Sequence, residues 1–406
     1  MYEVLNGVKV VEMGSFVFVP LASAVLADWG AEVIKVEPPV TGDQYRGLVT
    51  AGMTNELDGI NLSFQYANRG KRSVVLDLTK ERGRELFAEL IAGTDVFMTN
   101  LRPAVRARLK LDVDDLRRVN PDLIYVRGSG YGQHGPLAET AALDGTAYWA
   151  RGGVAEALTP ADREHPISQR PAFGDVMAAM TLAGGVAGAL YRKAALGVPS
   201  VVDVALLNVG MWQMQRDILS APYDAGAGKK VWDVDRTERN PLTGSYRTQD
   251  GRFVSIAIVN PDPYWVEFCT AIGRPDLAVD ERFTTTASRQ HHTAECVGIL
   301  DDWFATQPIA HWTKALEAFS GAWAPFQVPG DLHHDEQARV NGYFTTIDAE
   351  GRDLDVVSSP VTFDDLGEGR RMPGAPDMGQ HTEEVLLELG HSWEELIELK
   401  DAGVIN

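Results

Sequence analysis

The chain has 406 residues, which exceeds the ~100 to 200 residues of an ordinary domain and predicts one large core plus at least one smaller one. Its composition, 45% hydrophobic and 23% charged, is typical of a soluble globular protein and excludes general disorder. Acidic residues outnumber basic ones by 57 to 37, and a net charge of -20 makes the surface as a whole repel nucleic acid and anionic lipid. Any anionic ligand therefore requires a local basic site.

The two cysteines, Cys269 and Cys296, support neither a disulfide framework nor a thiolate metal cluster, and they fit a reducing compartment. Residues 1–6 lack the basic and apolar segments of a signal peptide, and no apolar stretch reaches the ~20 residues that cross a bilayer. The adjacent histidine pairs at 291–292 and 333–334 lack a metal-site pattern. We therefore predict a soluble, cytoplasmic protein without a metal site.

The first third of the chain alternates apolar strand-like runs with helical patterns. Strands are predicted at 8–11, 31–36, 73–78, 96–98 and 123–126, with helices at 20–29 and 79–92. This alternation predicts a parallel sheet covered by helices. The turn after the first strand, residues 14–20, lacks the spaced glycines of a dinucleotide site, so the pattern disfavours NAD.

Residues 174–195 are rich in Ala, Gly and Leu and predict a buried helix. Further on, Asp250-Gly251 between two strand-like runs predicts a hairpin, followed by helices near 263–272, 296–306 and 309–319. A strand near 354–357 and helices near 382–389 and 393–400 come last. We predict a large domain from residues 1–220, a small domain from 221–330, and a return of 331–406 to the large domain.

Basic residues gather between positions 69 and 118, where 12 Lys or Arg accompany 8 Asp or Glu. Residues 69–72 precede one predicted strand, and residues 100–108 follow another. Ligands bind at the ends of parallel strands, and Arg side chains suit phosphate oxygens. The same charges also fit a solvated helix and loop surface, so both interpretations stay open.

Asp175 directly precedes the small-residue helix, and Gly174 before it leaves the carboxylate little steric cover. The residue can cap the helix, and the same helix terminus favours an ionised carboxylate and leaves N–H groups for a developing oxyanion. No G-x-S-x-G serine competes with it as a nucleophile. Residues 128–136, rich in glycine, allow a ligand or another backbone to approach closely.

Taken together, these segments resemble the family III coenzyme A transferases, the group that includes formyl-CoA:oxalate and carnitine CoA-transferases and the α-methylacyl-CoA racemases. The resemblance covers nearly the whole chain, and eight segments follow in the family's order. They are residues 5–11 with 26–38, 42–43, 71–74, 100–103, 130–136, 174–175, 246–251 and 273–277.

The resemblance implies an α/β fold: a Rossmann-like parallel-sheet large domain built from both chain ends, a smaller α+β domain between them, and a homodimer of interlocked rings. It implies that Asp175 is the aspartate that becomes acylated. It also implies that coenzyme A is held by Lys71, Arg72, Asn100, Leu101, Arg102 and Arg108.

The implied activity is that of an acyl-CoA:carboxylate CoA-transferase. Asp175 attacks the donor thioester to give an aspartyl anhydride, and the released thiolate converts it into an aspartyl-CoA thioester, which the acceptor acid then opens. The CoA thioester is a substrate, so no tightly bound cofactor, ATP or metal is expected.

Two features bear on the substrate. Val17 and Phe18 stand where formyl-CoA-type enzymes carry a small polar pair of residues. This difference disfavours an oxalate-type acceptor. Phe16, Val17 and Phe18 either line an apolar acyl pocket or pack beneath the sheet. Tyr131 and Asp144 complete the candidate substrate pocket.

A racemase or isomerase and a non-catalytic CoA-binding protein are the alternatives. Racemisation at an α-carbon requires an acid and a base on opposite faces, and similar racemases carry a histidine directly before the position of Asp144. Here that residue is Leu143, which favours transfer; the role of His134 stays open. The presence of Asp175 argues against a non-catalytic protein.

Overall fold

The computed structural model describes residues 2–50, 52, 56–223, 235–363 and 371–406. By its internal contacts the chain divides into two compact units, one formed by residues 1–225 with 336–406 and the other by residues 226–335. Both ends of the chain therefore belong to the larger unit.

The larger unit is built on a six-stranded sheet whose paired neighbours all run parallel. Its strands lie in the order β5-β2-β1-β6-β7-β8, the third-second-first-fourth-fifth-sixth order of a doubly wound fold. They are β1 (Lys9–Met13), β2 (Glu32–Glu37), β5 (Lys71–Val75), β6 (Val96–Thr99), β7 (Ile124–Ser129) and β8 (Val201–Ala205). The predicted parallel α/β fold is confirmed.

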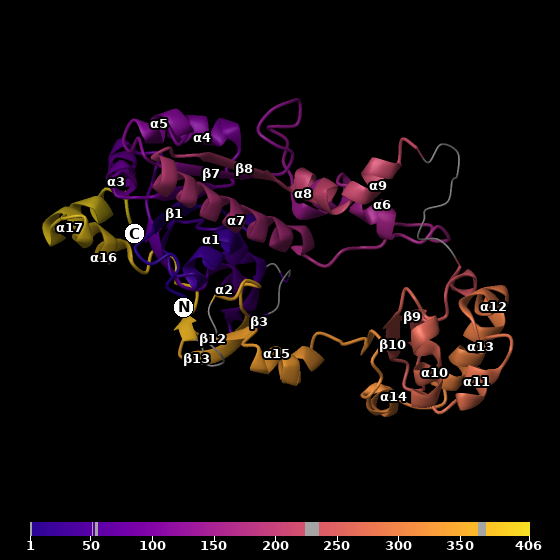
Figure 1. Ribbon diagram of the computed structural model, residues 1–406. Helices are drawn as coiled ribbons and strands as arrows, with labels where there is room; N and C mark the ends of the chain where they lie inside the picture. The colour runs from indigo at the N-terminus through magenta and orange to yellow at the C-terminus, as the bar shows by residue number, and fades with distance from the viewer. Residues whose placement is uncertain (1, 51, 53–55, 224–234, 364–370) are drawn as a thin grey trace. The chain divides into compact units, whose positions relative to one another are not determined.

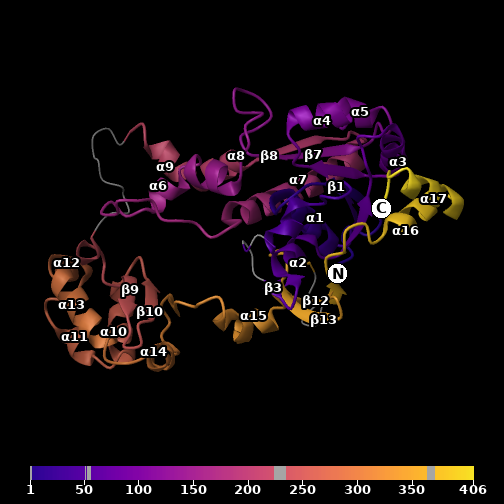
Figure 2. The same cartoon turned by 180° about the vertical axis from the view of Figure 1, so that it is seen from behind.

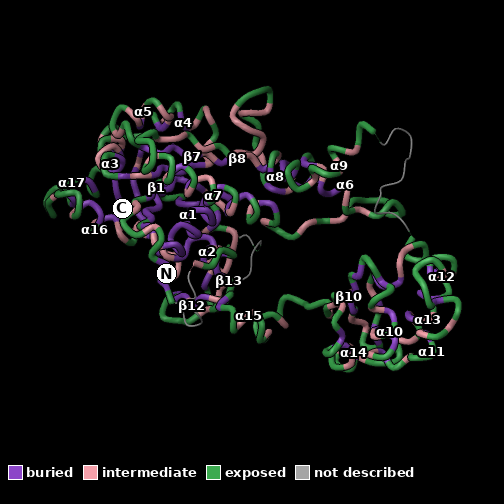
Figure 3. The backbone as a smooth tube through the Cα atoms, viewed as in Figure 1, coloured by how far each residue is buried: buried purple, intermediate pink, exposed green. Residues whose placement is uncertain are grey.

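Alternate residues of each strand enter separate cores on the two faces of the sheet, as the two-residue period of a strand requires. Val10 packs into the core that contains helices α1 (Phe18–Asp28), α2 (Leu62–Asn68) and α7 (Phe173–Leu196). Its neighbour Val11 packs into the other core, with α3 (Glu81–Ala92), α5 (Val113–Arg117), α16 (Thr382–Glu388) and α17 (Trp393–Asp401). Figures 1 and 2 show these helix layers, and Figure 3 shows the buried strands between them.

The C-terminal segment is joined to the rest of the larger unit by main-chain and side-chain hydrogen bonds. It contributes α15 (Glu336–Val340) and a small sheet of β12 (Phe344–Ala349), β13 (Arg352–Val357) and β14 (Arg371–Pro373). The Asp77 N–H donates to the Val404 carbonyl at 2.9 Å, and Ser359 accepts a hydrogen bond from the Trp29 indole at 3.0 Å. The other strands and α-helices of this unit are β3 (Glu56–Leu57), β4 (Ile60–Asn61), α4 (Pro103–Leu109), α6 (Val154–Leu158), α8 (Leu206–Gln213) and α9 (Gln215–Ser220). A 3-10 helix at Gln44–Leu48 and a π-helix at Gly145–Ala150 complete it.

The smaller unit contains an antiparallel sheet of β9 (Thr243–Arg247), β10 (Phe253–Ala257) and β11 (Trp323–Pro325). The hairpin predicted at Asp250-Gly251 joins β9 to β10, and Gly251 has the positive φ of 77° that favours glycine in this turn. The aromatic core of the smaller unit lies between this sheet and five helices, which are α10 (Asp262–Ala271), α11 (Pro275–Val279), α12 (Thr286–His291), α13 (Thr293–Phe304) and α14 (Ile309–Leu316).

Helix α7 is the one helix of the described residues that is long and apolar enough to cross a membrane. Core helices of globular proteins satisfy the same criterion, and Ala178, Leu182 and Val186 of α7 are buried against the sheet core. Length and composition therefore carry no argument for a membrane span here.

Candidate active site

A cavity of about 640 Å³ opens at the carboxyl ends of the central strands. Its walls come from the β1–α1 turn, from the segments that follow β6 and β7, from the loop around residues 138–146, and from the start of α7. The strand order reverses between β1 and β6, and such switch points are where open α/β sheets bind ligands. The lining includes Ser15, Phe16, Phe18, Gln44, Asn100, Leu101, Arg102, Arg106, Gly130, Gln133, Leu143, Thr146, Asp175 and Leu206.

Asn100 fixes one wall of this cavity. Its side-chain oxygen Oδ1 accepts the Ser15 N–H at 3.1 Å, and its Nδ2 donates to the Ser15 carbonyl at 2.8 Å. The residue therefore ties the turn after β1 to the end of β6, which brings Ser15, Phe16 and Leu101 to the same cavity.

Two glycines, one near the end of β7 and one just after it, let side chains approach this edge of the sheet. A Cβ atom at Gly128 would lie 2.6 Å from Val19 and 2.9 Å from Phe18, and one at Gly130 would lie 2.2 Å from the Ala142 Cβ. Any larger residue would displace Phe18 or the 138–146 loop from the cavity. The close approach that the glycine-rich segment predicts is therefore made by protein atoms.

Asp175 stands in the first turn of α7, and Gly174 sets its position. A Cβ atom at Gly174 would lie 2.3 Å from the ring of buried Tyr148, so only glycine allows the helix to start here. The Gly174 N–H donates to Asp144 Oδ2 at 2.9 Å, and the Gln169 amide donates to the other oxygen of Asp144. Asp144 thus caps α7 from outside the helix, while Asp175 faces the cavity.

Burial, and to a lesser degree the neighbouring Asp144 carboxylate, together raise the pKa of Asp175 to about 7. Removal from water disfavours the charged form, and a second negative charge nearby adds to that penalty. A carboxyl group tuned to neutral pH and facing a cavity is a candidate for catalysis.

The arginines of α4 and its approach differ in their surroundings. Arg106 is buried and donates to Asp112, to the Leu101 carbonyl at 2.7 Å and to Gln133 at 3.0 Å, so its charge supports the wall itself. Arg102 lines the cavity, is exposed, and makes only a long 3.3 Å hydrogen bond to the Glu139 carbonyl among the contacts described. Its guanidinium is thus the one best placed to meet an anionic ligand.

Comparison with known proteins decides the family. The sequence profile of CoA-transferase family III matches residues 5–382. The chain belongs to this family. The enzyme is 32% identical over 402 residues to the (R)-2-hydroxy-4-methylpentanoate CoA-transferase of Clostridioides difficile, covering 99% of both chains. It is also 32% identical to the cinnamoyl-CoA:phenyllactate CoA-transferase of Clostridium sporogenes, covering 99% of this chain and 98% of the relative.

Solved structures agree with this assignment. A CAIB/BAIF family protein from Brucella suis superposes with a TM-score of 0.80 at 28% identity, covering 95% of the enzyme and 99% of that chain. Rv3272 from Mycobacterium tuberculosis superposes with a TM-score of 0.75 at 28% identity, covering 93% and 97%. The enzyme is therefore a family III CoA-transferase with the fold of these proteins.

The structure separates the predicted CoA-binding residues into two groups. Asn100, Leu101 and Arg102 share the cavity with Asp175, whereas exposed Arg108 on α4 lies outside its lining. Lys71 and Arg72 are also outside the lining. Asn100, Leu101 and Arg102 therefore remain the candidates for a CoA site at this cavity.

Lys71 and Arg72 begin β5, and both side chains are engaged elsewhere. The Lys71 ammonium is fully buried and donates to Glu12 at 2.8 Å, to Asn68 at 2.8 Å and to the Pro20 carbonyl at 2.7 Å. Arg72 forms ion pairs with Glu32, Glu384 and Glu388 near the amino ends of the strands.

The predicted substrate residues also divide. Phe16 and Phe18 line the cavity, while Val17 between them is 2% exposed and packs into the core beneath the sheet. Tyr131 lies outside the lining, with the Arg151 guanidinium 5.8 Å from its ring centre. Asp144 acts on the cavity through Gly174, and exposed His134 does not line it.

Sequence reasoning missed several lining residues, notably Ser15, Gln44, Gln133, Thr146 and Leu206. Ser15 lies in the turn 14–20, next to the predicted residue Phe16. Gln133 lies in the glycine-rich segment 128–136, next to His134. The others come from connections without a local chemical signal, and only the fold brings them to the cavity. Within the described ranges no group of three or more His, Cys, Asp or Glu side chains is arranged to hold a metal ion.

Proposed function

We propose that the enzyme is an acyl-CoA:carboxylate CoA-transferase in which Asp175 is the covalent nucleophile. The observation that carries the proposal is that Asp175 lines the cavity at the sheet edge together with Asn100 and Arg102. The relatives described above are named for transfer of CoA between a thioester and a carboxylic acid, which supports the same reaction class.

The proposed reaction consists of four acyl transfers. An Asp175 oxygen attacks the donor thioester carbonyl, and the CoA thiolate leaves as an aspartyl anhydride forms. The thiolate then attacks the Asp175 carbonyl, releasing the donor acid and giving an aspartyl-CoA thioester. The acceptor carboxylate displaces the thiolate to form a second anhydride, and attack of the thiolate on its acyl carbonyl yields the product thioester and free Asp175.

The start of α7 suits these steps. The first-turn N–H groups of a helix have no partner within the helix, and Asp144 uses that of Gly174. The remaining N–H groups and the helix dipole are available to negative charge that develops on the Asp175 carbonyl oxygen. Asp144 therefore helps to place the nucleophile while its charge raises the Asp175 pKa.

We expect kcat/KM to rise with pH and to level off above about pH 7, because only the ionised Asp175 attacks and its pKa is raised to about 7. At pH 6 the rate constant should be about tenfold below its plateau, since each pH unit below a pKa removes about a factor of ten of the anion. Asp144→Asn removes the neighbouring charge and should move the midpoint to lower pH. A pH-rate series on both proteins tests this, and a midpoint unmoved by Asp144→Asn would contradict it.

We propose that Asn100, Leu101 and Arg102 hold the nucleotide end of coenzyme A. Arg102→Ala should weaken CoA binding by about 1 to 3 kcal/mol, the cost of losing a charge-assisted hydrogen bond. Isothermal titration with CoA measures the change. Arg118→Ala is the matched control, because this exposed arginine pairs with Asp115 outside the cavity lining. Equal Kd values for Arg102→Ala and Arg118→Ala would move the nucleotide site elsewhere.

The cavity walls near Asp175 support an apolar acyl group. Phe16, Phe18, Leu143 and Leu206 line the cavity together with small alanines at 141 and 142. Such walls favour burial of a branched or aromatic side chain over a second carboxylate. The proposed substrates are accordingly hydrophobic acids and their CoA thioesters.

We also propose an interlocked homodimer in the cytoplasm. Large apolar side chains on α7 to α9 are exposed in the single chain, among them Met177 at 47%, Trp212 at 69% and Leu219 at 72%. Helix α7 contacts α8, and α8 contacts α9, and exposed large apolar side chains on neighbouring helices are typical of surfaces that a partner covers. Both cysteines are buried free thiols, which is compatible with a reducing compartment.

The experiment that tests the activity also separates it from racemisation. The enzyme is incubated with a branched acyl-CoA in deuterated water, with and without a second carboxylic acid, and the products are analysed by mass spectrometry. Transfer predicts a new CoA thioester only when the acid is present. Rapid deuterium incorporation at the α-carbon without an acid would instead support racemisation. Leu143, 59% exposed at the cavity, cannot supply the second acid or base.

A further inference from the structure

Beside the cavity, the turn between β1 and α1 is held by side chains at five consecutive main-chain groups. Glu12 accepts the Gly14 N–H at 2.9 Å, and Lys35 donates to the Gly14 carbonyl at 3.0 Å. Asn100 holds the N–H and carbonyl of Ser15. Asp43 Oδ1 accepts the N–H of Phe16 at 3.0 Å. The turn thus depends on residues from β1, β2, the segment after β2 and the segment after β6.

The last of these hydrogen bonds holds an unfavourable conformation. Phe16 has a φ of 65°, in the left-handed region that bulky residues rarely adopt. Because Phe16 is not glycine, its backbone stays there only where the surroundings impose it. The same conformation places Phe16 at the cavity wall, between Ser15 and the start of α1.

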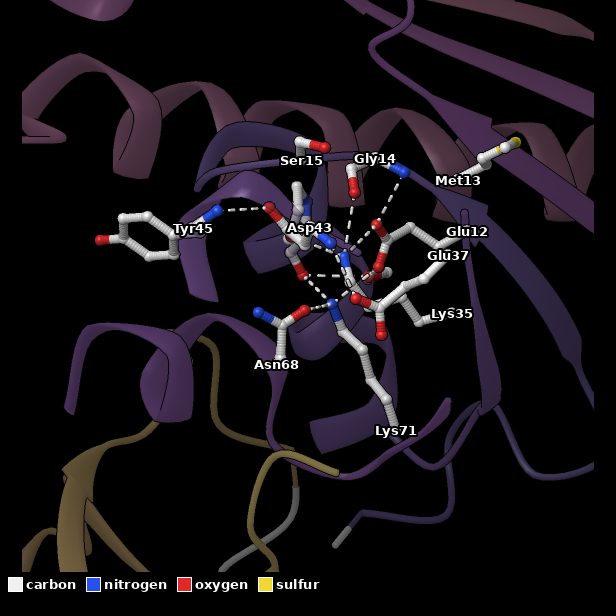
Figure 4. Close-up of polar contacts among 12 residues, drawn as sticks. Glu12, Met13, Gly14, Ser15, Lys35, Glu37, Asp43, Tyr45, Asn68 and Lys71 are labelled. Carbon is white, nitrogen blue, oxygen red and sulfur yellow. Dashed lines mark hydrogen bonds and ion pairs between the residues drawn. The ribbon is translucent and has the colours of Figure 1, made fainter. Parts of the chain in front are cut away.

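Asp43 is itself fixed by a buried charge network, which Figure 4 shows converging under the turn. Its Oδ2 lies 2.8 Å from the Lys35 ammonium, and its Oδ1 also accepts the Tyr45 N–H at 2.9 Å. Lys35 in turn lies 3.0 Å from Glu12, and the side chains of all three ionic residues are fully buried. A carboxylate held on both oxygens has little freedom to follow a movement of the turn.

We propose that Asp43 is a positioning residue of the active site, which holds Phe16 in its left-handed conformation and thereby sets the Ser15–Phe16 wall of the substrate cavity. The role in turnover rests on the proposed function, whereas the role in shaping the cavity does not. Asp43 does not line the cavity, and its contact with the Ser15–Phe16 wall is the hydrogen bond from the Phe16 N–H. Lys35 supports it by fixing the second carboxylate oxygen.

A double-mutant cycle tests this role. Asp43→Asn replaces the carboxylate by an amide, which has one acceptor oxygen and one donor NH2 group. The amide oxygen can face either the Phe16 N–H or the Lys35 ammonium, and the NH2 group then meets the other donor without a hydrogen bond. Phe16→Gly allows a positive φ without an external anchor. We expect Asp43→Asn to reduce kcat/KM by about tenfold or more in the native background but by about twofold or less in the Phe16→Gly background.

A second readout does not require turnover. The Kd for CoA, measured by calorimetry in the same four proteins, should show the same coupling because Ser15 and Phe16 form part of the cavity wall. Asp203→Asn is the matched control, because this half-exposed aspartate pairs with Arg127 and lies outside the cavity lining. Its kcat/KM and its Kd for CoA should both stay at the native level. If Asp43→Asn fails to fold, Asp43→Glu takes its place, since it keeps the charge and moves the acceptor by one methylene.

The outcomes separate the two proposals. Equal losses in both backgrounds, in kcat/KM and in Kd, would show that Asp43 only stabilises the fold and would overturn the positioning role. Native values for Asp43→Asn in the native background would also overturn it. A native enzyme that transfers no CoA but shows the coupling in Kd would overturn the proposed function while supporting the role of Asp43.

Discussion

Asp175→Asn should abolish CoA transfer, lowering kcat by at least ~10³-fold, because an amide cannot form the anhydride on which the proposed reaction depends. The amide has nearly the same shape as the carboxyl group, and Gly174 and Asp144 still define the start of α7. Steady-state kinetics with any active donor and acid measures the loss. Transfer at the native rate in this variant would refute the nucleophile assignment.

The same substitution should leave a distinct signature in stability. The pKa of Asp175 in the folded protein is raised from its ordinary value of 3.8 to about 7, so the native carboxyl group contributes stability below about pH 4 that is lost as the pH rises through about 7. Asn does not titrate. The melting temperature of Asp175→Asn relative to the native enzyme should therefore increase between pH 5 and pH 8. A constant difference would show that Asp175 is not the perturbed group.

A covalent readout completes this prediction. Hydroxylamine should trap an acylated Asp175 only after acyl-CoA is added, and peptide mass spectrometry should locate the product at this residue. Asp203→Asn serves as the control, because it changes the same functional group at a residue outside the cavity lining. A hydroxamate on another residue would transfer the nucleophilic role to that residue.

Lys35→Met should destabilise the larger unit by about 3 to 5 kcal/mol, the usual cost of removing one partner from a buried ion pair. Burial alone would lower the pKa of Lys35, but the Asp43 and Glu12 carboxylates raise it above its ordinary value. Its positive charge is thus present at neutral pH. Without it, two buried carboxylates remain close together with Lys71 as the nearby cation, and burial lowers the pKa of that residue to about 7 despite the opposing effect of Glu12.

Urea unfolding measures this loss, with Lys110→Met as the control at an exposed lysine. Removing Asp43 as well, in the double variant Lys35→Met and Asp43→Asn, should recover part of the stability, since Glu12 keeps its ion pair with Lys71. A Lys35→Met variant as stable as Lys110→Met would contradict the prediction.

The parallel α/β fold follows from local sequence patterns. Apolar runs such as those at 96–98 and 123–126 alternate with helical periodicity, and each of them forms a strand of the central sheet. The pattern determines this much because a strand buried on both faces requires a continuous apolar run. β8 at Val201–Ala205 was not predicted: Asp203 interrupts its apolar run, and the strand pairs with β7 alone at the edge of the sheet.

By itself, the sequence indicated Asp175 only as a carboxylate after glycine at the start of a small-residue helix, and it placed Asn100 and Arg102 after a strand. The nucleophilic role of Asp175 comes from the family resemblance and stays a prediction. Only the tertiary structure decided between the neighbouring basic residues. Lys71 begins β5 and Arg102 follows β6. The fold buries the Lys71 ammonium against Glu12, whereas the Arg102 guanidinium stays at the cavity. A basic residue beside a strand has the same sequence pattern whether it forms a buried ion pair or binds a ligand. The two cases differ in which other atoms the folded sheet brings into contact with it.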